Sequence, residues 1–207
     1  MEYKDRDHVI LFATSNEGKM KEVRMILADL GMPVLSLKEA GIQVDIVEDG
    51  KSFEENAVIK VKALRPFTDG IILADDSGLE VDALDKRPGI YSARFMGEDT
   101  SYEIKNRAII DAVKDVPEEK RTARFVCVIA ASMPDGTILT SRGTIEGRIA
   151  HEPAGEEGFG YDPIVYVPEL GKTTAELSPI QKNEVSHRGK ALREMKERIR
   201  IYMKTAE

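Results

Sequence analysis

Val9-Ile10-Leu11-Phe12-Ala13-Thr14-Ser15-Asn16-Glu17-Gly18-Lys19 runs from an apolar segment through a small polar loop into a helical pattern. A polar loop with a lysine at a strand-to-helix junction is suited to binding phosphate, because backbone N–H groups and the helix dipole attract anions there. It is not a Walker A loop, since that motif needs two spaced glycines and a hydroxyl residue after the lysine, and Lys19 is followed by Met20. The sequence therefore predicts phosphate binding without P-loop machinery.

Apolar runs and helical patterns alternate along the rest of the chain, which predicts an α/β fold. The predicted strands cover residues 8–14, 34–37, 42–47, 71–75, 122–132, 137–149 and 163–167. The turn at residues 133–136 predicts a β-hairpin over residues 121–149, so we expect a mixed sheet. The 207 residues contain no internal repeat and no convincing linker, and we expect one domain, 1–207.

Four predicted helix starts differ in the charges that they carry. The starts at Ser52 and Thr100 read as capping boxes with acidic first turns, as the helix dipole favours. The starts near Asn16 and Ser186 carry bases instead, namely Lys19 and Lys21 in the first and His187, Arg188 and Lys190 in the second. An anion bound at both starts would account for this contrast, and solvated surface charge is the alternative.

Two adjacent carboxylates, Asp75 and Asp76, close a predicted strand before Ser77-Gly78, where we expect the chain to turn. Neighbouring side chains of a strand point to opposite faces, so one aspartate should face a given site while the other accepts loop N–H groups. A hard cation such as Mg²⁺ prefers oxygen ligands and substrate phosphates, and Asp76 could share it with an acid of Glu48-Asp49. Turn-forming surface acids are the alternative.

The segment Gly155-Glu156-Glu157-Gly158-Phe159-Gly160-Tyr161-Asp162-Pro163 reverses the dinucleotide-binding fingerprint and precedes a strand, so it is not a Rossmann loop. Its glycines would let the backbone approach a planar ligand, on which Phe159 or Tyr161 could stack while Asp162 accepts N–H protons. The alternative is a tight glycine turn with a core aromatic residue.

Composition and motifs argue against several other classes of protein and of functional site. The net charge of -7 argues against sequence-independent binding to nucleic acid, so a phosphate site must be local. The single cysteine, Cys127, lies in an apolar run and cannot build a disulfide framework or a thiolate zinc site. Residues 1–7 lack a signal-peptide pattern and no apolar run approaches the roughly 20 residues of a membrane span, which predicts a cytoplasmic setting with no membrane partner. There is no G-x-S-x-G elbow, and the histidines are too scattered for a local zinc signature.

Taken together, the motifs make the chain similar to the inosine/xanthosine triphosphate pyrophosphatase family. The match covers nearly the whole sequence through Thr14–Lys19, Phe53-Glu54-Glu55-Asn56-Ala57, Ala74-Asp75-Asp76-Ser77-Gly78-Leu79, Pro88–Phe95, Gly158–Pro163 and Lys182–Arg188. The resemblance implies homodimers with a long mixed sheet flanked by helices, two lobes and a nucleotide cleft between them. It also implies Mg²⁺-dependent cleavage of ITP, dITP and XTP to the monophosphate and pyrophosphate, which removes non-standard purines from the nucleotide pool.

The resemblance carries residue roles over to matching positions. It implies triphosphate binding by Thr14, Ser15, Asn16, Glu17, Gly18, Lys19 and Lys60. Asp76 would act as general base or metal carboxylate, Glu48 as second metal ligand, and Ser77 as a substrate contact. Phe159, Gly160, Tyr161 and Asp162 would hold the purine, and Lys182, His187 and Arg188 would complete the contacts with the base and the phosphates. One position departs from the family's pattern, because Ser15 stands where many relatives have glycine.

Two alternatives remain beside this hypothesis. A nucleotide-binding regulator would keep the pocket without turnover, although the intact Asp76 weighs against it. A related pyrophosphatase would act on other modified nucleotides, such as methylated pyrimidines. Hypoxanthine and xanthine present an N1–H donor and an O6 acceptor, opposite to adenine, so buried polar partners could reject adenine strongly.

Overall fold

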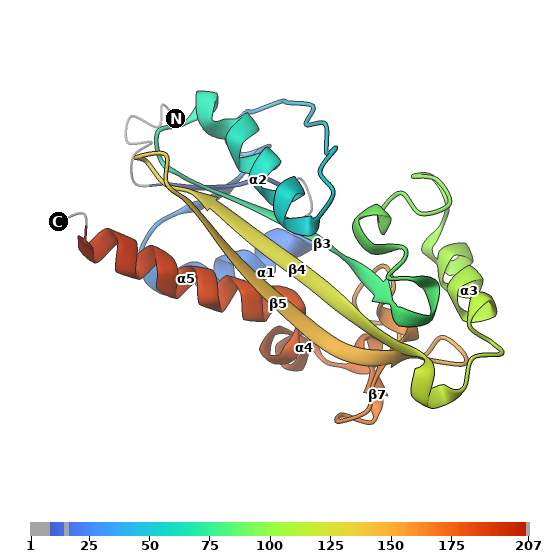
Figure 1. Ribbon diagram of the computed structural model, residues 1–207. Coiled ribbons are helices and arrows are strands. Elements are labelled where there is room, and N and C mark those ends of the chain that lie inside the picture. Colours follow the sequence, from blue (N-terminus) through green and yellow to red (C-terminus); the bar gives the residue numbers. More distant parts are fainter. Residues whose placement is uncertain (1–8, 15–16, 206–207) are drawn as a thin grey trace. The chain divides into compact units, whose positions relative to one another are not determined.

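The computed structural model describes residues 9–14 and 17–205, and for Glu17 only the backbone. Its strands are β1 (Ile10–Phe12), β2 (Val34–Ser36), β3 (Ile71–Val81), β4 (Thr122–Ser132), β5 (Ile138–Ile149), β6 (Val165–Val167) and β7 (Lys172–Thr173). Its α-helices are α1 (Glu17–Leu27), α2 (Phe53–Leu64), α3 (Tyr102–Ala112), α4 (Pro179–Val185) and α5 (His187–Thr205) (Figure 1). No helix within these described ranges has both the length and the apolar character needed to cross a bilayer.

The strands form one mixed sheet in the order β2-β1-β3-β4-β5-β6-β7. β1 is parallel to both β2 and β3, whereas β6 is antiparallel to β5 and to β7. The predicted α/β class and mixed sheet are confirmed. The predicted strand at residues 42–47 is wrong, because the structure has no strand there, and β3 continues through Ser77 and Gly78 where a turn was expected.

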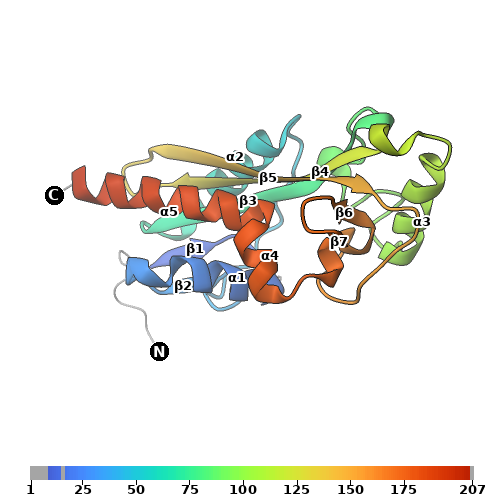
Figure 2. The ribbon, with the colours of Figure 1, turned by 90° about the horizontal axis from the view of Figure 1, so that it is seen from below.

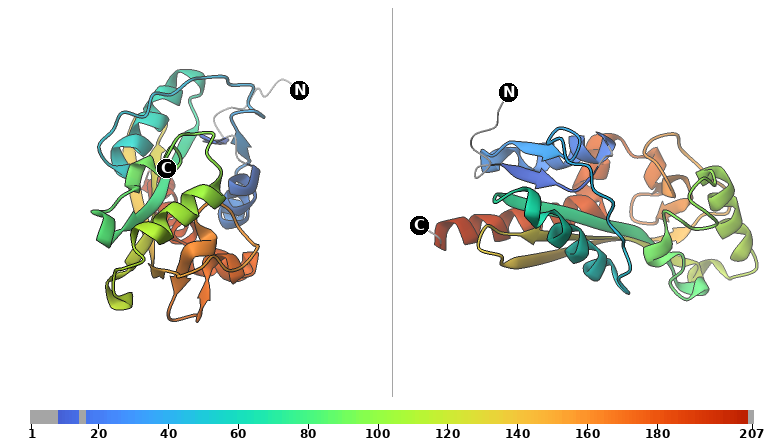
Figure 3. Two further views of the ribbon diagram at one scale, coloured as in Figure 1. Left: turned by 90° about the vertical axis from the view of Figure 1, so that its right-hand side faces the viewer. Right: turned by 90° about the horizontal axis from the view of Figure 1, so that it is seen from above.

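Two compact units make up the chain, and β3, β4 and β5 each contribute residues to both. The first unit comprises the described residues of the ranges 1–76, 127–143 and 188–207. In it, α1 and α5 lie on one face of the strands and α2 on the other (Figure 1; Figure 3, right). This arrangement decides which face each β3 side chain meets.

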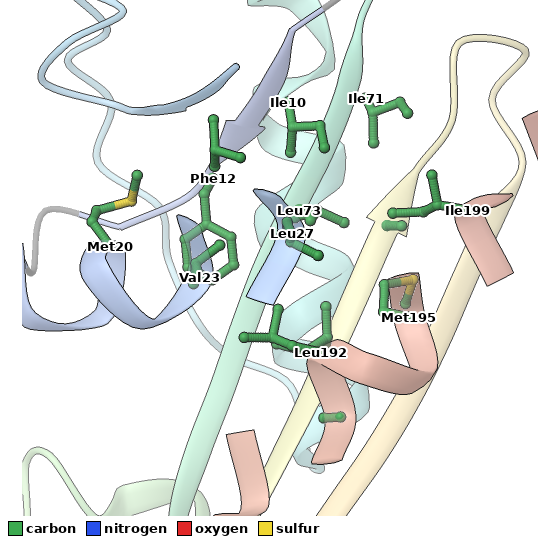
Figure 4. Packing of buried hydrophobic residues seen from close by; sticks show 14 of the residues in the cluster. Ile10, Phe12, Met20, Val23, Leu27, Ile71, Leu73, Leu192, Met195 and Ile199 are labelled. Carbon is green, nitrogen blue, oxygen red and sulfur yellow. The ribbon is translucent and has the colours of Figure 1, made fainter. Parts of the chain in front are cut away.

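The core of the first unit lies between its strands and the apolar stripes of α1 and α5 (Figure 4). Met20, Val23 and Leu27 recur at helical spacing in α1, and Leu192 and Met195 do so in α5; all five are fully buried. Burying side chains of this size contributes about 1.5–3 kcal/mol each. The first helical pattern stops as predicted, with Gly31 in the left-handed conformation at φ 70.

The second unit comprises residues 77–126 and 144–187. Its core packs α3 residues Ile109 and Ile110 with strand residues Leu79 and Phe125. Strands β6 and β7 lie side by side, and the chain then enters α4 (Figure 2). Helix α4 was not predicted, although Ser178 and Gln181 form a capping box at its start.

The cap of α2 and the burial of Cys127 are as the sequence predicts, and the cap of α3 differs by one residue. Ser52 caps α2 by accepting a hydrogen bond from the Glu55 N–H, as predicted. The cap of α3 is Ser101 rather than Thr100, because the Ser101 side chain accepts from the Ile104 N–H. Cys127 is fully buried in β4.

Candidate functional site

Asp75 and Asp76 lie near the middle of β3 and are both buried, with 2% and 8% of their surface exposed. Successive strand side chains alternate between faces, so Asp75 follows Ile71 and Leu73 toward α1 and α5 while Asp76 points toward α2. Buried carboxylates are costly unless they are paired, and each of these two has cationic partners in the first unit.

Asp75 holds two of the cations that the sequence assigns to substrate binding. Its carboxylate accepts from the Lys19 ammonium at 2.8 and 3.1 Å and from Arg188 Nε at 3.4 Å. Arg188 is 4% exposed and also donates from Nη1 to Glu22 at 2.9 Å. Burial alone would raise the pKa of Asp75, but attraction to Lys19 and Arg188 outweighs burial and holds that pKa well below its usual range. Arg188 therefore sits in a buried ion-pair cluster, and solvated surface charge does not describe it.

Asp76 faces a different set of partners on α2. Its Oδ2 accepts from Asn56 Nδ2 at 3.2 Å, and its Oδ1 accepts from the Lys60 ammonium at 3.0 Å. Asn56 and Lys60 are four residues apart, so they share one face of the helix. Burial raises the pKa of Asp76 above its ordinary value, although Lys60 and Asn56 pull it down. A carboxylate with a raised pKa is better matched to accepting a proton near neutral pH.

Lys60 joins the second predicted carboxylate to this cluster. Its ammonium lies 2.9 Å from Glu48 and also donates to the backbone carbonyl oxygen of Asp75 at 2.9 Å. Burial lowers the pKa of Lys60, but attraction to Asp76, Asp75 and Glu48 gives a net rise. Glu48 and Asp76 thus contact the same cation.

The donor set suits a hard divalent cation. Two carboxylates on one ammonium show that Glu48 and Asp76 can approach a single positive centre, and Mg²⁺ binds in just this way through one or two carboxylates plus phosphates and waters. Among the described residues no group of three or more His, Cys, Asp or Glu side chains could hold a metal by itself. Two carboxylates supply only part of an octahedral shell, so a Mg²⁺ held by Glu48 and Asp76 would take its other ligands from phosphate and water oxygens.

The predicted phosphate loop is only partly described. Thr14 follows β1 and donates its backbone N–H to the Phe12 carbonyl at 2.8 Å. Helix α1 begins at Glu17, with Gly18 exposed in its first turn. Ser15, Asn16 and the side chain of Glu17 lie outside the described residues, so their predicted roles stay predictions.

The glycine-rich loop of the second unit is organised around the buried carboxylate of Asp162. Oδ2 accepts from the Phe159 backbone N–H at 2.8 Å and from the Lys182 ammonium at 2.5 Å, and Oδ1 accepts from Thr174 Oγ1 at 2.8 Å. A side chain at Gly158 could not fit, because its Cβ would lie 2.3 Å from Asp162 Oδ2 and its φ is +80. Sequence reasoning missed the Thr174 contact.

The two aromatic residues of this loop have different surroundings. Phe159 is 51% exposed, with the Lys182 ammonium 5.1 Å from its ring centroid. Tyr161 is buried and donates its hydroxyl proton to the Ser92 carbonyl at 2.7 Å. Of the two, Phe159 offers a face for stacking, while Tyr161 anchors the loop.

His187, the first residue of α5, stacks on Phe125 at 5.0 Å between ring centroids with an interplanar angle of 17°. Ser77 is half-buried in β3 directly after Asp76.

The predicted site residues gather in three clusters. The first joins Lys19, Asp75 and Arg188, the second joins Glu48, Lys60 and Asp76, and the third joins Phe159, Asp162 and Lys182.

Similarity to one protein family extends over nearly the whole chain. Residues 10–198 match the Ham1 family. A protein of Desulforamulus reducens named "dITP/XTP pyrophosphatase" is 47% identical over 195 residues, which cover 94% of this chain and 97% of that protein. A Bacillus subtilis protein of the same name is 45% identical over 185 residues, covering 89% and 93%. The solved structure of the Staphylococcus aureus Ham1 protein matches with a TM-score of 0.84 and 41% identity, covering 92% of this chain and 97% of that one. The resemblance inferred from the motifs is confirmed, and the chain belongs to the Ham1 family.

Proposed function

We propose that this chain is a Mg²⁺-dependent pyrophosphatase that converts dITP, ITP and XTP to the nucleoside monophosphate and pyrophosphate. Its relatives of 45–47% identity are named for dITP and XTP. The observation that carries the proposal is the contact of Glu48 and Asp76 with the single ammonium of Lys60. Such a cluster supplies a metal-binding carboxylate pair, a phosphate-binding cation and a proton acceptor in one place.

The reaction needs little covalent help from the protein. The oxygen of a water molecule bonds to the α-phosphorus while Asp76 accepts a proton from that water. The bond between the α-phosphorus and the α–β bridging oxygen breaks, and this oxygen leaves as part of pyrophosphate. The residues from Thr14 to Lys19, together with Lys60, bind and orient the phosphate oxygens. A bound Mg²⁺, held by Glu48 and Asp76, would neutralise charge on those oxygens.

Base recognition is assigned to the loop of the second unit. The exposed face of Phe159 stacks on the purine. The contacts described for Asp162 use both lone pairs of Oδ2 but only one of Oδ1, so Oδ1 can accept the N1–H of hypoxanthine or xanthine. Lys182 uses one of its three donors at Asp162 and can give another to O6. Adenine lacks both features and would leave these groups unpaired.

A panel of triphosphates tests the proposal. Purified protein with Mg²⁺ is mixed with dITP, ITP, XTP, ATP, GTP and a methylated pyrimidine triphosphate, and initial rates are compared. We expect faster turnover of dITP, ITP and XTP, and loss of turnover when EDTA removes the metal. Equal rates on ATP would contradict the proposal, and preference for the pyrimidine would favour a related pyrophosphatase. Binding of XTP without any product would identify a regulator.

The family resemblance also leads us to propose that the enzyme is a homodimer. Analytical ultracentrifugation at micromolar concentration would test this, with a dimer as the expected species. A monomer across the working concentration range would contradict it.

A further inference from the structure

Helix α3 contacts the base-binding loop through its first two turns. Asn106 donates from Nδ2 to the carbonyl oxygen of Gly160 at 3.1 Å. One turn earlier, the ring of Tyr102 meets that of Tyr161 edge-on, with centroids 5.2 Å apart and an interplanar angle of 88°. The Gly160 carbonyl lies between Phe159 and Tyr161 in the chain, so its position affects the orientation of both.

The other end of the Asn106 amide is unusual. Asn106 is 5% exposed, yet within the part of the chain that the structure describes its Oδ1 has no hydrogen-bond partner. A buried carbonyl oxygen without a donor destabilises a fold, and leucine would have nearly the same shape without that cost. A residue that is poor for stability but well placed for one contact is typical of a functional position.

We propose that Asn106 is a positioning residue, which fixes the Gly160 carbonyl and thereby holds Phe159 in the orientation that binds the purine. The inference rests on the proposed function, because that function assigns Phe159 to the base. The hydrogen bond itself, and the order that it gives the loop, belong to the nucleotide-free protein. The two proposals can therefore fail separately.

Asn106→Leu tests the inference, with Arg107→Ala as the control. Arg107 is the next residue of α3, and both residues line a surface pocket of about 980 Å³. Arg107 is exposed and forms an ion pair with Glu152 at 3.0 Å. For Asn106→Leu we expect the KM for dITP to rise about fivefold, with kcat within about twofold of the wild type. The melting temperature should change little, because removal of the unpaired oxygen offsets loss of the hydrogen bond to the Gly160 carbonyl. Arg107→Ala should change none of these quantities.

Hydrogen–deuterium exchange provides a readout that needs no substrate. In nucleotide-free Asn106→Leu, the amides of residues 158–162 should exchange faster than in the wild type, and those of β4 should not. Asn106→Asp keeps the shape and the acceptor but, at pH 8, removes the donor. It should show the same faster exchange and the same rise in KM.

Wild-type exchange in the loop of both Asn106 variants would overturn the inference, as would a wild-type KM in both. A fall in kcat together with a lower melting temperature in Asn106→Leu would also overturn it, since that result indicates a structural role. If the wild-type protein releases no pyrophosphate from dITP or XTP, the proposed function fails, while the exchange result still decides whether Asn106 positions the loop.

Discussion

Asp75 and Asp76 are neighbours in β3, yet their carboxylates bind different lysines on opposite faces of the sheet, Lys19 of α1 and Lys60 of α2. The alternation of strand side chains thus separates two roles that the sequence places side by side. Asp75 balances the charge of Lys19 and Arg188, while Asp76, with its raised pKa, meets Lys60 and Asn56.

The role of Asp76 can be tested with Asp76→Asn. The amide keeps the size of the side chain but accepts no proton, so kcat for dITP should fall about 10³-fold while the nucleotide still binds. Stopped assays and calorimetric titration measure the two quantities. In the control, Glu48→Gln, the Mg²⁺ concentration for half-maximal rate should rise and excess Mg²⁺ should restore the rate. A near-normal kcat for Asp76→Asn would remove Asp76 from the proton-transfer role.

Asp75→Asn should destabilise the first unit. It leaves the buried Arg188 and the Lys19 ammonium without their shared carboxylate, at a cost of about 3 kcal/mol in the free energy of unfolding. Urea denaturation measures this cost. Glu22→Gln removes only one contact of Arg188, so its effect should be smaller. If the two variants are equally stable, Asp75 is not the centre of this cluster.

The structural elements differ in how well the sequence predicts them, because a strand forms only where another strand pairs with its backbone. Strand β4 was predicted with its observed bounds because a long run of buried residues has few alternatives. Residues 42–47 instead alternate between half-buried and exposed side chains, as in a strand with one covered face, but they pair with no strand in the described structure. A strand needs a neighbour for its backbone groups, and periodicity alone does not specify one.

The residues of the candidate site were likewise predictable from the sequence, whereas their long-range contacts were not. Residue types and spacing singled out Asp76, Glu48 and Phe159, and the family resemblance added Lys60 and Lys182; the structure places all five in clusters. The ion pair between Asp75 and Arg188 spans 113 residues, so no local pattern could reveal it. Asn56 was within reach of sequence reasoning, because helical spacing puts it on the face of Lys60.

Phe159→Ala tests the assignment of the exposed ring to the base. Loss of stacking should raise the KM for dITP about tenfold or more and leave kcat nearly unchanged, because the reacting phosphates are untouched. The KM and kcat of initial-rate kinetics check this. Phe67→Ala, which also removes a partly exposed ring, is the matched control and should have no effect on KM. Equal KM values for both variants would contradict a stacking role for Phe159.

Acid stability should depend on Asp82. Hydrogen bonds from Arg124, at 2.9 and 3.0 Å, hold the pKa of Asp82 well below its usual range. Because the folded-state pKa is lower than the unfolded value of about 3.9, the ion pair stabilises the protein above that pH and loses its effect as the pH falls toward the folded-state pKa. Asp82→Asn should therefore cost about 1 kcal/mol at pH 7 and less below pH 4, as urea midpoints across pH would show.

The exposed Asp85 of the same segment is the control for this experiment. Asp85→Asn should change the free energy of unfolding at pH 7 by less than Asp82→Asn does, because Asp85 is exposed. A constant difference in the free energy of unfolding between the wild type and Asp82→Asn from pH 3 to 7 would contradict this prediction. It would show that the Arg124 contact does not cause the loss of stability at low pH.

The identity of the products tests the central claim most directly. Phosphorus-31 NMR of XTP or dITP incubated with the enzyme and Mg²⁺ should show the nucleoside monophosphate and pyrophosphate appearing together, in equal amounts, with no nucleoside diphosphate. The same sample with Asp76→Asn should show almost no change. Orthophosphate with a nucleoside diphosphate would mean that the terminal phosphate is cleaved instead, and would contradict the account given for Asp76, Lys60 and Glu48.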